Sequence, residues 1–121
     1  MNQSVVLYAV VRFTVPGFHR WPGAPASRSY LRERHRHLFY MEVKLETFHE
    51  EREVEFHDLL AESKDLFPGG ELDDRSCETM ARTMVNQISG LYPGRRLEVS
   101  VFEDNEVGAV VTVEPQRNQG G

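Results

Sequence analysis

The chain has 121 residues and a mass of 14.0 kDa, the size of one compact domain, which excludes a two-domain arrangement. With 40% hydrophobic and 27% charged residues it can bury a modest core, but it has no apolar run near the roughly 20 residues of a membrane span. Its formal net charge of −5 argues against general nucleic-acid binding. We expect a soluble globular protein that binds neither nucleic acid nor membrane.

The N-terminus and the cysteine content give an expectation for the compartment. Residues 1–8 show no basic segment followed by an apolar stretch and a cleavage site, so we expect no export signal. The one cysteine, Cys77, cannot form an intrachain disulfide, which suits a reducing environment. A cytoplasmic location is the prediction.

The first half of the chain predicts two strands joined by a long loop. Val5–Thr14 is β-branched and apolar on both faces, which predicts a strand covered on two sides. Val15–Arg34 is rich in Pro, Gly, Ser and Arg and is expected to be a loop. His35–Thr47 alternates between apolar and polar residues, and His35 and His37 extend its apolar face.

The second half predicts two amphipathic helices and two more strands. A helix is expected near His57–Leu66, and a second helix from the N-cap Ser76 to Leu91. Strands are expected at Leu97–Glu103 and Val107–Val113. We therefore predict one α+β domain over residues 1–115 and a disordered tail over residues 116–121.

The predicted order ββααββ indicates a four-stranded antiparallel sheet with both helices on one face. The apolar character of both faces of the first strand leaves the other sheet face without cover. In so short a chain, the most economical partner for that face is another subunit.

Basic residues are concentrated near the N-terminus. Residues 1–40 hold six basic residues against one acidic residue, whereas residues 41–121 hold eight against eighteen. A basic, histidine-rich loop in an acidic protein indicates a local anion site, although plain solvated charge is the commoner role of such arginines. Five of the six share one segment: Arg20, Arg28, Arg32, Arg34 and Arg36.

Three histidines are candidate metal ligands. His35 and His37 lie on one face of a strand about 7 Å apart, which suits two ligands of one ion, and His19 can supply a third. Three neutral imidazoles with a fourth position open fit zinc or another borderline metal. The alternative is that they are ordinary polar residues, because His-x-His alone is a weak motif.

Acidic and polar residues at two further places are candidates for ligand binding. Glu103 ends an apolar strand face, where a carboxylate needs a partner such as the N–H donors of a ligand, or has emerged into solvent. Ser76 and Glu78 have sufficient structural reasons as a helix cap and a helix-dipole partner. Cys77 is either a nucleophile at the helix N-terminus or a buried filler.

Together these pieces resemble the 6-pyruvoyl-tetrahydropterin synthase and 6-carboxy-tetrahydropterin synthase family of the tunnelling fold (T-fold). The likeness covers most of the chain. It is carried by Phe18-His19-Arg20, His35-Arg36-His37, Glu53-Val54-Glu55-Phe56, Ser76-Cys77-Glu78-Thr79-Met80-Ala81 and Val101-Phe102-Glu103.

The resemblance implies a zinc ion held by His19, His35 and His37. It also implies that Glu103, with help from Ser76, Cys77 and Glu78, holds a guanidine-like ring edge of a small-molecule substrate. A homohexamer of two stacked trimers with active sites between subunits follows from the same likeness. The arginine-rich loop can then hold a phosphate or carboxylate of the substrate.

The chain departs from the family pattern in its acid–base residues. The family's nucleophilic cysteine falls on Leu31, and Arg36 replaces the glycine of the histidine pair. Of the family's Asp-His stretch only Leu72-Asp73-Asp74 remains. Glu33 or Asp73 can take over proton transfer, and the sequence does not choose between them.

Three functions remain open at this point. The first is a zinc-dependent lyase or synthase of the pterin-synthase type. The second is a T-fold cyclase recruited to natural-product biosynthesis, for example an amine–aldehyde condensation of the Pictet–Spengler type. The third is a non-catalytic ligand-binding oligomer.

Overall fold

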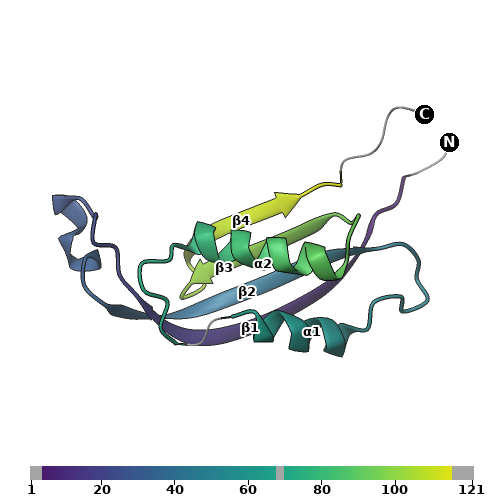
Figure 1. Ribbon diagram of the computed structural model, residues 1–121, viewed down its shortest axis with the longest axis horizontal. Coiled ribbons are helices and arrows are strands. Elements are labelled where there is room, and N and C mark those ends of the chain that lie inside the picture. Colours follow the sequence, from purple (N-terminus) through teal and green to yellow (C-terminus); the bar gives the residue numbers. More distant parts are fainter. Residues whose placement is uncertain (1–3, 68–69, 116–121) are drawn as a thin grey trace.

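A computed structural model describes residues 4–67 and 70–115 of the chain (Figure 1). It confirms the α+β class and the antiparallel four-stranded sheet, whose strand order is β1-β2-β3-β4. A short 3-10 helix, η1, lies in the β1–β2 connection. The elements are β1 (Leu7–His19), η1 (Ala26–Leu31), β2 (His35–Thr47), α1 (Phe56–Asp65), α2 (Cys77–Leu91), β3 (Leu97–Glu103) and β4 (Val107–Val113).

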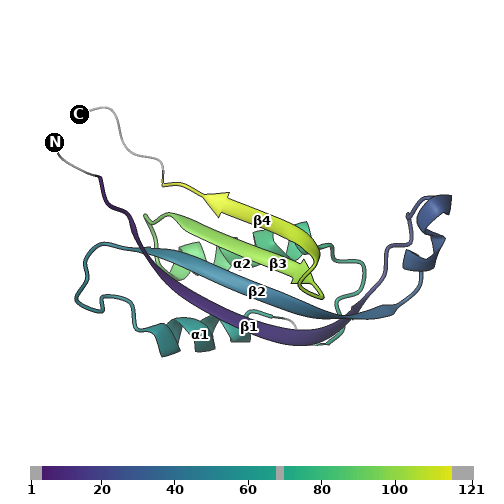
Figure 2. The same ribbon diagram turned by 180° about the vertical axis from the view of Figure 1, so that it is seen from behind.

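Both α-helices cover the same face of the sheet, and the other face is open in the single chain (Figures 1 and 2). α2 packs on β3 and β4, and α1 lies on β1. The alternation of each strand sends one set of apolar side chains into the core and the other set outward. The most deeply buried large residues of this core are Phe39, Met41, Leu45, Leu59, Leu72, Ile88 and Leu97.

The outer sheet face carries apolar side chains from both edge strands. Tyr8 and Val10 of β1 are 39% and 41% exposed, and Val110 of β4 is 51% exposed. We expected β1 to be covered on both faces. Within the part of the chain that the structure describes, only the inner face of β1 is covered.

The first strand is longer than predicted. Val15–His19 was expected to be loop, but β1 continues to His19 and pairs with the start of β2. Pro16 is tolerated because β1 is an edge strand of the sheet, where a missing N–H costs little. Gly17 allows close packing here: a Cβ at this position would lie 2.8 Å from Leu72 Cδ1 and 3.0 Å from the Phe39 ring, so these buried side chains would have to shift.

The segment 70–75 docks against the end of β1. The Phe18 N–H donates to the Gly70 carbonyl at 2.7 Å, and the Leu72 N–H donates to the Phe18 carbonyl at 2.9 Å. The Arg20 N–H donates to the Asp73 carbonyl at 2.8 Å. These bonds place the chain that leads into α2 beside the last residues of β1.

The helices begin close to their predicted positions. α2 is capped as expected, because the Ser76 hydroxyl accepts a hydrogen bond from the Thr79 N–H. α1 begins at Phe56, and the side chain of its N-cap Glu55 accepts from the Asp58 N–H. The predicted tail, residues 116–121, lies outside the described residues. Among the described residues, no helix combines the length and apolar character needed to cross a membrane.

An arginine clamp joins the connection after β2 to the start of β3. Both Arg95 Nη atoms lie 3.0 Å from the two carboxylate oxygens of Glu53, and Nη1 also donates to the Glu46 carbonyl. The Arg95 guanidinium stacks on Phe48, whose N–H donates to Glu53 at 2.7 Å. Hydrogen bonds from Arg95, and then from Phe48, lower the pKa of Glu53 to about 2.

This clamp predicts a loss of stability in acid. Because the folded pKa of Glu53 lies below its ordinary value of 4.5, its contribution is present above pH 4.5 and is lost as the pH falls toward 2. The free energy of unfolding, measured by urea titration, should differ most between the wild type and Glu53→Gln near neutral pH. The difference should shrink as the pH falls from about 5 to about 2.

Glu50→Gln is the matched control, because Glu50 is an exposed residue of the same connection. A difference between the wild type and Glu53→Gln that stays constant over this pH range would contradict the prediction.

Candidate metal centre

The pairing of β1 with β2 brings three histidines together. His19 is the last residue of β1 and faces His35, the first residue of β2, while His37 lies two residues further along the same strand. One ring nitrogen from each lies within 4.8 Å of those of the other two. These three residues, as predicted, can hold a metal ion. His19 is buried, at 8% exposure.

Each imidazole is oriented by a hydrogen bond at Nδ1. The Nδ1 atoms of His19, His35 and His37 lie 3.0 Å from the Arg75 carbonyl, 2.8 Å from the Glu33 carbonyl and 2.7 Å from Asp104 Oδ2, respectively. A carbonyl or carboxylate oxygen accepts only, so each Nδ1 carries the proton and a neutral ring presents its lone pair at Nε2. The Nε2 atom of His37 is buried and has no hydrogen-bond partner among the described residues.

Glu103 lies directly beside this cluster. Its Oε1 is 3.3 Å from His19 Nε2, and its Oε2 is 3.6 Å from His37 Nε2. Hydrogen bonding with Glu103 raises the pKa of His19, and the same bond lowers the pKa of the Glu103 carboxyl. The Glu103 carboxylate therefore favours positive charge at His19.

The donor set fits a metal ion of the zinc type. Three imidazoles with Nδ1 tethered to oxygen acceptors reproduce the arrangement in which outer-shell partners orient metal-binding histidines. The Nε2 atom of His37, which makes no hydrogen bond within the described part of the chain and lies 3.6 Å from Glu103 Oε2, is a group that a bound ion would satisfy. The fit is to a borderline metal held by three nitrogens with a further position open.

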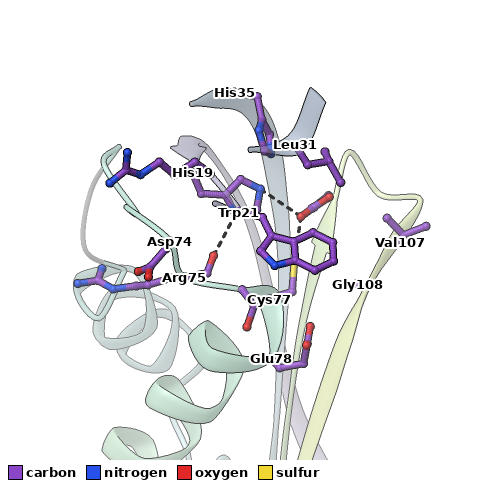
Figure 3. A pocket seen from close by; sticks show the side chains of 13 residues that line it. His19, Trp21, Leu31, His35, Asp74, Arg75, Cys77, Glu78, Val107 and Gly108 are labelled. Atoms are coloured by element: carbon purple, nitrogen blue, oxygen red, sulfur yellow. Dashed lines mark hydrogen bonds and ion pairs between the residues drawn. The ribbon is translucent and has the colours of Figure 1, made fainter. Parts of the chain in front are cut away.

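A pocket of about 490 Å³ opens over the cluster (Figure 3). This volume falls within the range of small-molecule sites. Its walls come from the end of β1, the base of the β1–β2 connection, the start of α2 and the β3–β4 hairpin. The lining residues are His19, Arg20, Trp21, Leu31, His35, Asp74, Arg75, Ser76, Cys77, Glu78, Glu103, Val107 and Gly108.

The residues predicted to bind substrate, Ser76, Cys77, Glu78 and Glu103, all line this pocket. Cys77 is buried, and its thiol donates to Glu103 Oε1 at 3.7 Å. Burial, and then the charge of Glu103, raises the pKa of Cys77 to about 12. The thiol is therefore protonated at neutral pH, which is the opposite of an activated nucleophile.

The two carboxylates expected to transfer protons lie apart from the pocket lining. Glu33 contributes its backbone carbonyl to His35, and Asp73 contributes its backbone carbonyl to Arg20. Asp73 has a left-handed backbone with a φ of 53°, and the carboxylate of this turn that lines the pocket is Asp74. Catalytic roles for Glu33 and Asp73 stay predictions.

The arginines of the basic segment lie in different places. Arg20 lines the pocket. Arg34 pairs with Glu71 and stacks on Phe18, with its guanidinium carbon 3.7 Å from the ring centroid. Arg32 donates to the Ala24 carbonyl at 2.8 Å. Arg75, which precedes α2 and lies outside the basic segment, joins Arg20 at the pocket.

Two residues of the site were missed from the sequence. Asp104, in the turn after β3, accepts from both His37 Nδ1 and the Leu38 N–H, at 2.7 and 2.9 Å. The local sequence does not mark Asp104, because the pairing of Phe39 with Glu103 is what brings it to His37. Trp21, the single tryptophan, had been included in the loop.

Comparisons with known proteins place the chain in no family, because no protein-family model and no curated protein matches it.

The tethered imidazoles predict stoichiometric metal binding. Purified protein incubated with zinc and dialysed should retain about one ion per chain by elemental analysis, and His35→Ala should lose it. Asp104→Asn keeps the shape of the side chain but weakens its hold on His37, so its zinc affinity should fall roughly 10- to 100-fold in a competition titration with a chelator.

His57→Ala is the control, because His57 is exposed on α1, away from the cluster. Equal zinc retention by the wild type and His35→Ala would show that the three histidines do not form the site.

Proposed function

We propose that the chain is a zinc-dependent enzyme of the T-fold, of the 6-pyruvoyl- or 6-carboxy-tetrahydropterin synthase type, acting on a pterin-like substrate. One observation carries the proposal: three Nδ1-tethered imidazoles form one cluster, and two of them, His19 and His35, line a pocket together with Glu103. The order of these residues along the chain matches the family pattern to which the sequence is similar.

The chain's own residues divide the work of binding. His19, His35 and His37 would hold the ion, which when bound polarises substrate oxygens and eases proton removal from the neighbouring carbon. Glu103 accepts N–H donors from a guanidine-like ring edge, with Ser76 and Glu78 on the same wall. Arg20 and Arg75 supply positive charge at the pocket for a phosphate or carboxylate of the substrate.

Proton transfer falls to a carboxylate in this proposal, because the pocket holds no activated thiol. Leu31 occupies the place of the family's cysteine, and the Cys77 thiol is protonated. Glu33 and Asp73 are the candidates from the sequence, and Asp74 is the carboxylate of the same turn that lines the pocket. Removal of a C–H proton by a carboxylate beside a metal ion is ordinary general-base chemistry.

The proposal includes assembly into a hexamer of two trimers. Such an assembly would cover the outer sheet face with Tyr8, Val10 and Val110. It would also cover the edge of β4 that pairs with no other strand among the described residues. Val107 and Gly108, near the start of β4, line the pocket, so a subunit paired there would border the site. We also propose a cytoplasmic location, because a lone cysteine that cannot form an intrachain disulfide suits a reducing environment.

A cyclase of the Pictet–Spengler type is the second candidate, favoured by Leu31 and the protonated Cys77. Such a reaction condenses an amine with an aldehyde, loses water, closes a ring and loses a C–H proton to a base. Carboxylates suffice for these proton transfers, so the absence of a thiolate in the pocket is no obstacle. A non-catalytic ligand-binding oligomer is the outcome if neither substrate class reacts.

The pterin-synthase proposal predicts turnover that depends on Glu103. Zinc-loaded protein incubated with dihydroneopterin triphosphate should release triphosphate with either a pyruvoyl pterin or acetaldehyde, followed by chromatography. Glu103→Gln exchanges a charged acceptor for a neutral amide, so KM should rise at least about tenfold while bound zinc stays near one per chain.

Glu98→Gln provides the matched control, because Glu98 lies on the same strand but on the opposite sheet face. If the zinc-loaded wild type formed neither a pyruvoyl pterin nor acetaldehyde, the pterin-synthase proposal would be rejected. Loss of zinc in Glu103→Gln would make Glu103 a metal ligand instead of a ring anchor.

Neutralising the three candidate carboxylates one at a time should identify the base. The residue that transfers the proton should lose roughly 100-fold or more in kcat when changed to its amide, with KM little altered. Asp73→Asn, Asp74→Asn and Glu33→Gln are compared under steady-state conditions. Full kcat in all three variants would exclude this group of residues as the base.

A further inference from the structure

Trp21 forms an aromatic wall of the pocket that the proposed chemistry does not use. It lies two residues after His19, at the base of the β1–β2 connection, and it is 49% exposed. Figure 3 shows its indole among the side chains around the pocket, which also include Leu31. A half-exposed tryptophan on a pocket wall leaves a large apolar face available to a ligand.

The backbone under this indole is held on both sides. The Trp21 N–H donates to the Leu31 carbonyl at 2.7 Å, and the Trp21 carbonyl accepts from the Ala24 N–H at 3.1 Å. Ala24 is itself buried at 3% exposure, and its carbonyl accepts from Arg32 Nε. The backbone turn that carries the indole is therefore already ordered, so a ligand that uses the indole does not have to order this turn.

The other side chains of the pocket define what can lie against the indole. Glu103 presents carboxylate oxygens, which accept N–H donors. A flat ring with an N–H edge can therefore satisfy the carboxylate with its edge and the indole with its face. A flexible aliphatic substrate would leave the aromatic wall without a matching surface.

Accepting the proposed function, we propose that Trp21 is a specificity-determining residue that stacks on a planar heteroaromatic ring whose N–H edge faces Glu103. Stacking of a heterocyclic base on an aromatic side chain changes affinity by roughly tenfold or more. Tyr30 of η1 is also exposed, at 69%, but it does not line the pocket, so it offers a matched control within the same connection.

Calorimetric titration of the zinc-loaded variants with pterin tests the inference. Trp21→Ala and Trp21→Leu should each raise the Kd about tenfold or more, whereas Trp21→Phe should stay within about threefold of the wild type. Tyr30→Ala should bind as the wild type does. Leucine keeps the apolar bulk but has no aromatic face. Weak pterin binding by Trp21→Leu together with near-wild-type binding by Trp21→Phe would therefore identify aromatic stacking and not general hydrophobic contact.

Guanidinium chloride at millimolar concentration is the second probe, since it carries the N–H edge without a ring to stack. Its competition with pterin should be equally strong in the wild type and Trp21→Phe.

Trp21 is the only tryptophan, so saturable quenching of wild-type fluorescence by pterin should give the calorimetric Kd. Zinc content, measured on every variant, should stay near one per chain and shows that the variant is folded at the site.

The outcomes separate this inference from the proposed function. Equal Kd values for Trp21→Ala and the wild type overturn the role of Trp21 and leave turnover intact. Tryptophan-dependent pterin binding without any turnover of dihydroneopterin triphosphate supports the stacking role and rejects the pterin-synthase reading. Failure of the zinc-loaded wild type to bind pterin overturns both.

Discussion

The antiparallel pairing of β1 with β2 is the constraint on which the site depends. Its register sets His19 opposite His35, and the two-residue period of a strand returns His37 to the same face. A shift of one residue would turn both β2 histidines to the outer face of the sheet and separate them from His19. Gly17 lets Phe39 and Leu72 pack closely beneath the final residues of β1.

The three imidazoles are oriented by three different parts of the chain, and those that orient His19 and His37 are distant from them in sequence. Arg75 lies before α2, Glu33 before β2, and Asp104 in the β3–β4 turn, yet each supplies an oxygen to one Nδ1 atom. This arrangement leaves the other ring nitrogens to be satisfied by Glu103 or by an ion. The pocket beside them is lined by carboxylates, arginines and one indole.

The strands and helices from His35 onward were predictable because their hydrophobic periods are regular and Ser76 caps its helix. The end of β1 was not predictable, because Pro16-Gly17 is typical of a turn. Only the folded structure shows that these residues lie on an edge strand and that Gly17 is closely packed. The histidine cluster followed from spacing together with the family resemblance. Asp104 and Trp21 were missed because sheet register and a folded connection, which no local pattern encodes, bring them to the site.

The docking of residues 70–75 on the end of β1 has a thermodynamic consequence. This segment adds to the outer edge of the sheet through a few backbone bonds, and it also holds the acceptor that aligns the His19 ring. Local detachment of the segment would release that ring, so an ion bound by the ring must oppose detachment to the same extent. Metal binding at the three histidines would therefore be thermodynamically linked to the docking of residues 70–75, although His19 and its acceptor Arg75 are 56 positions apart in the chain.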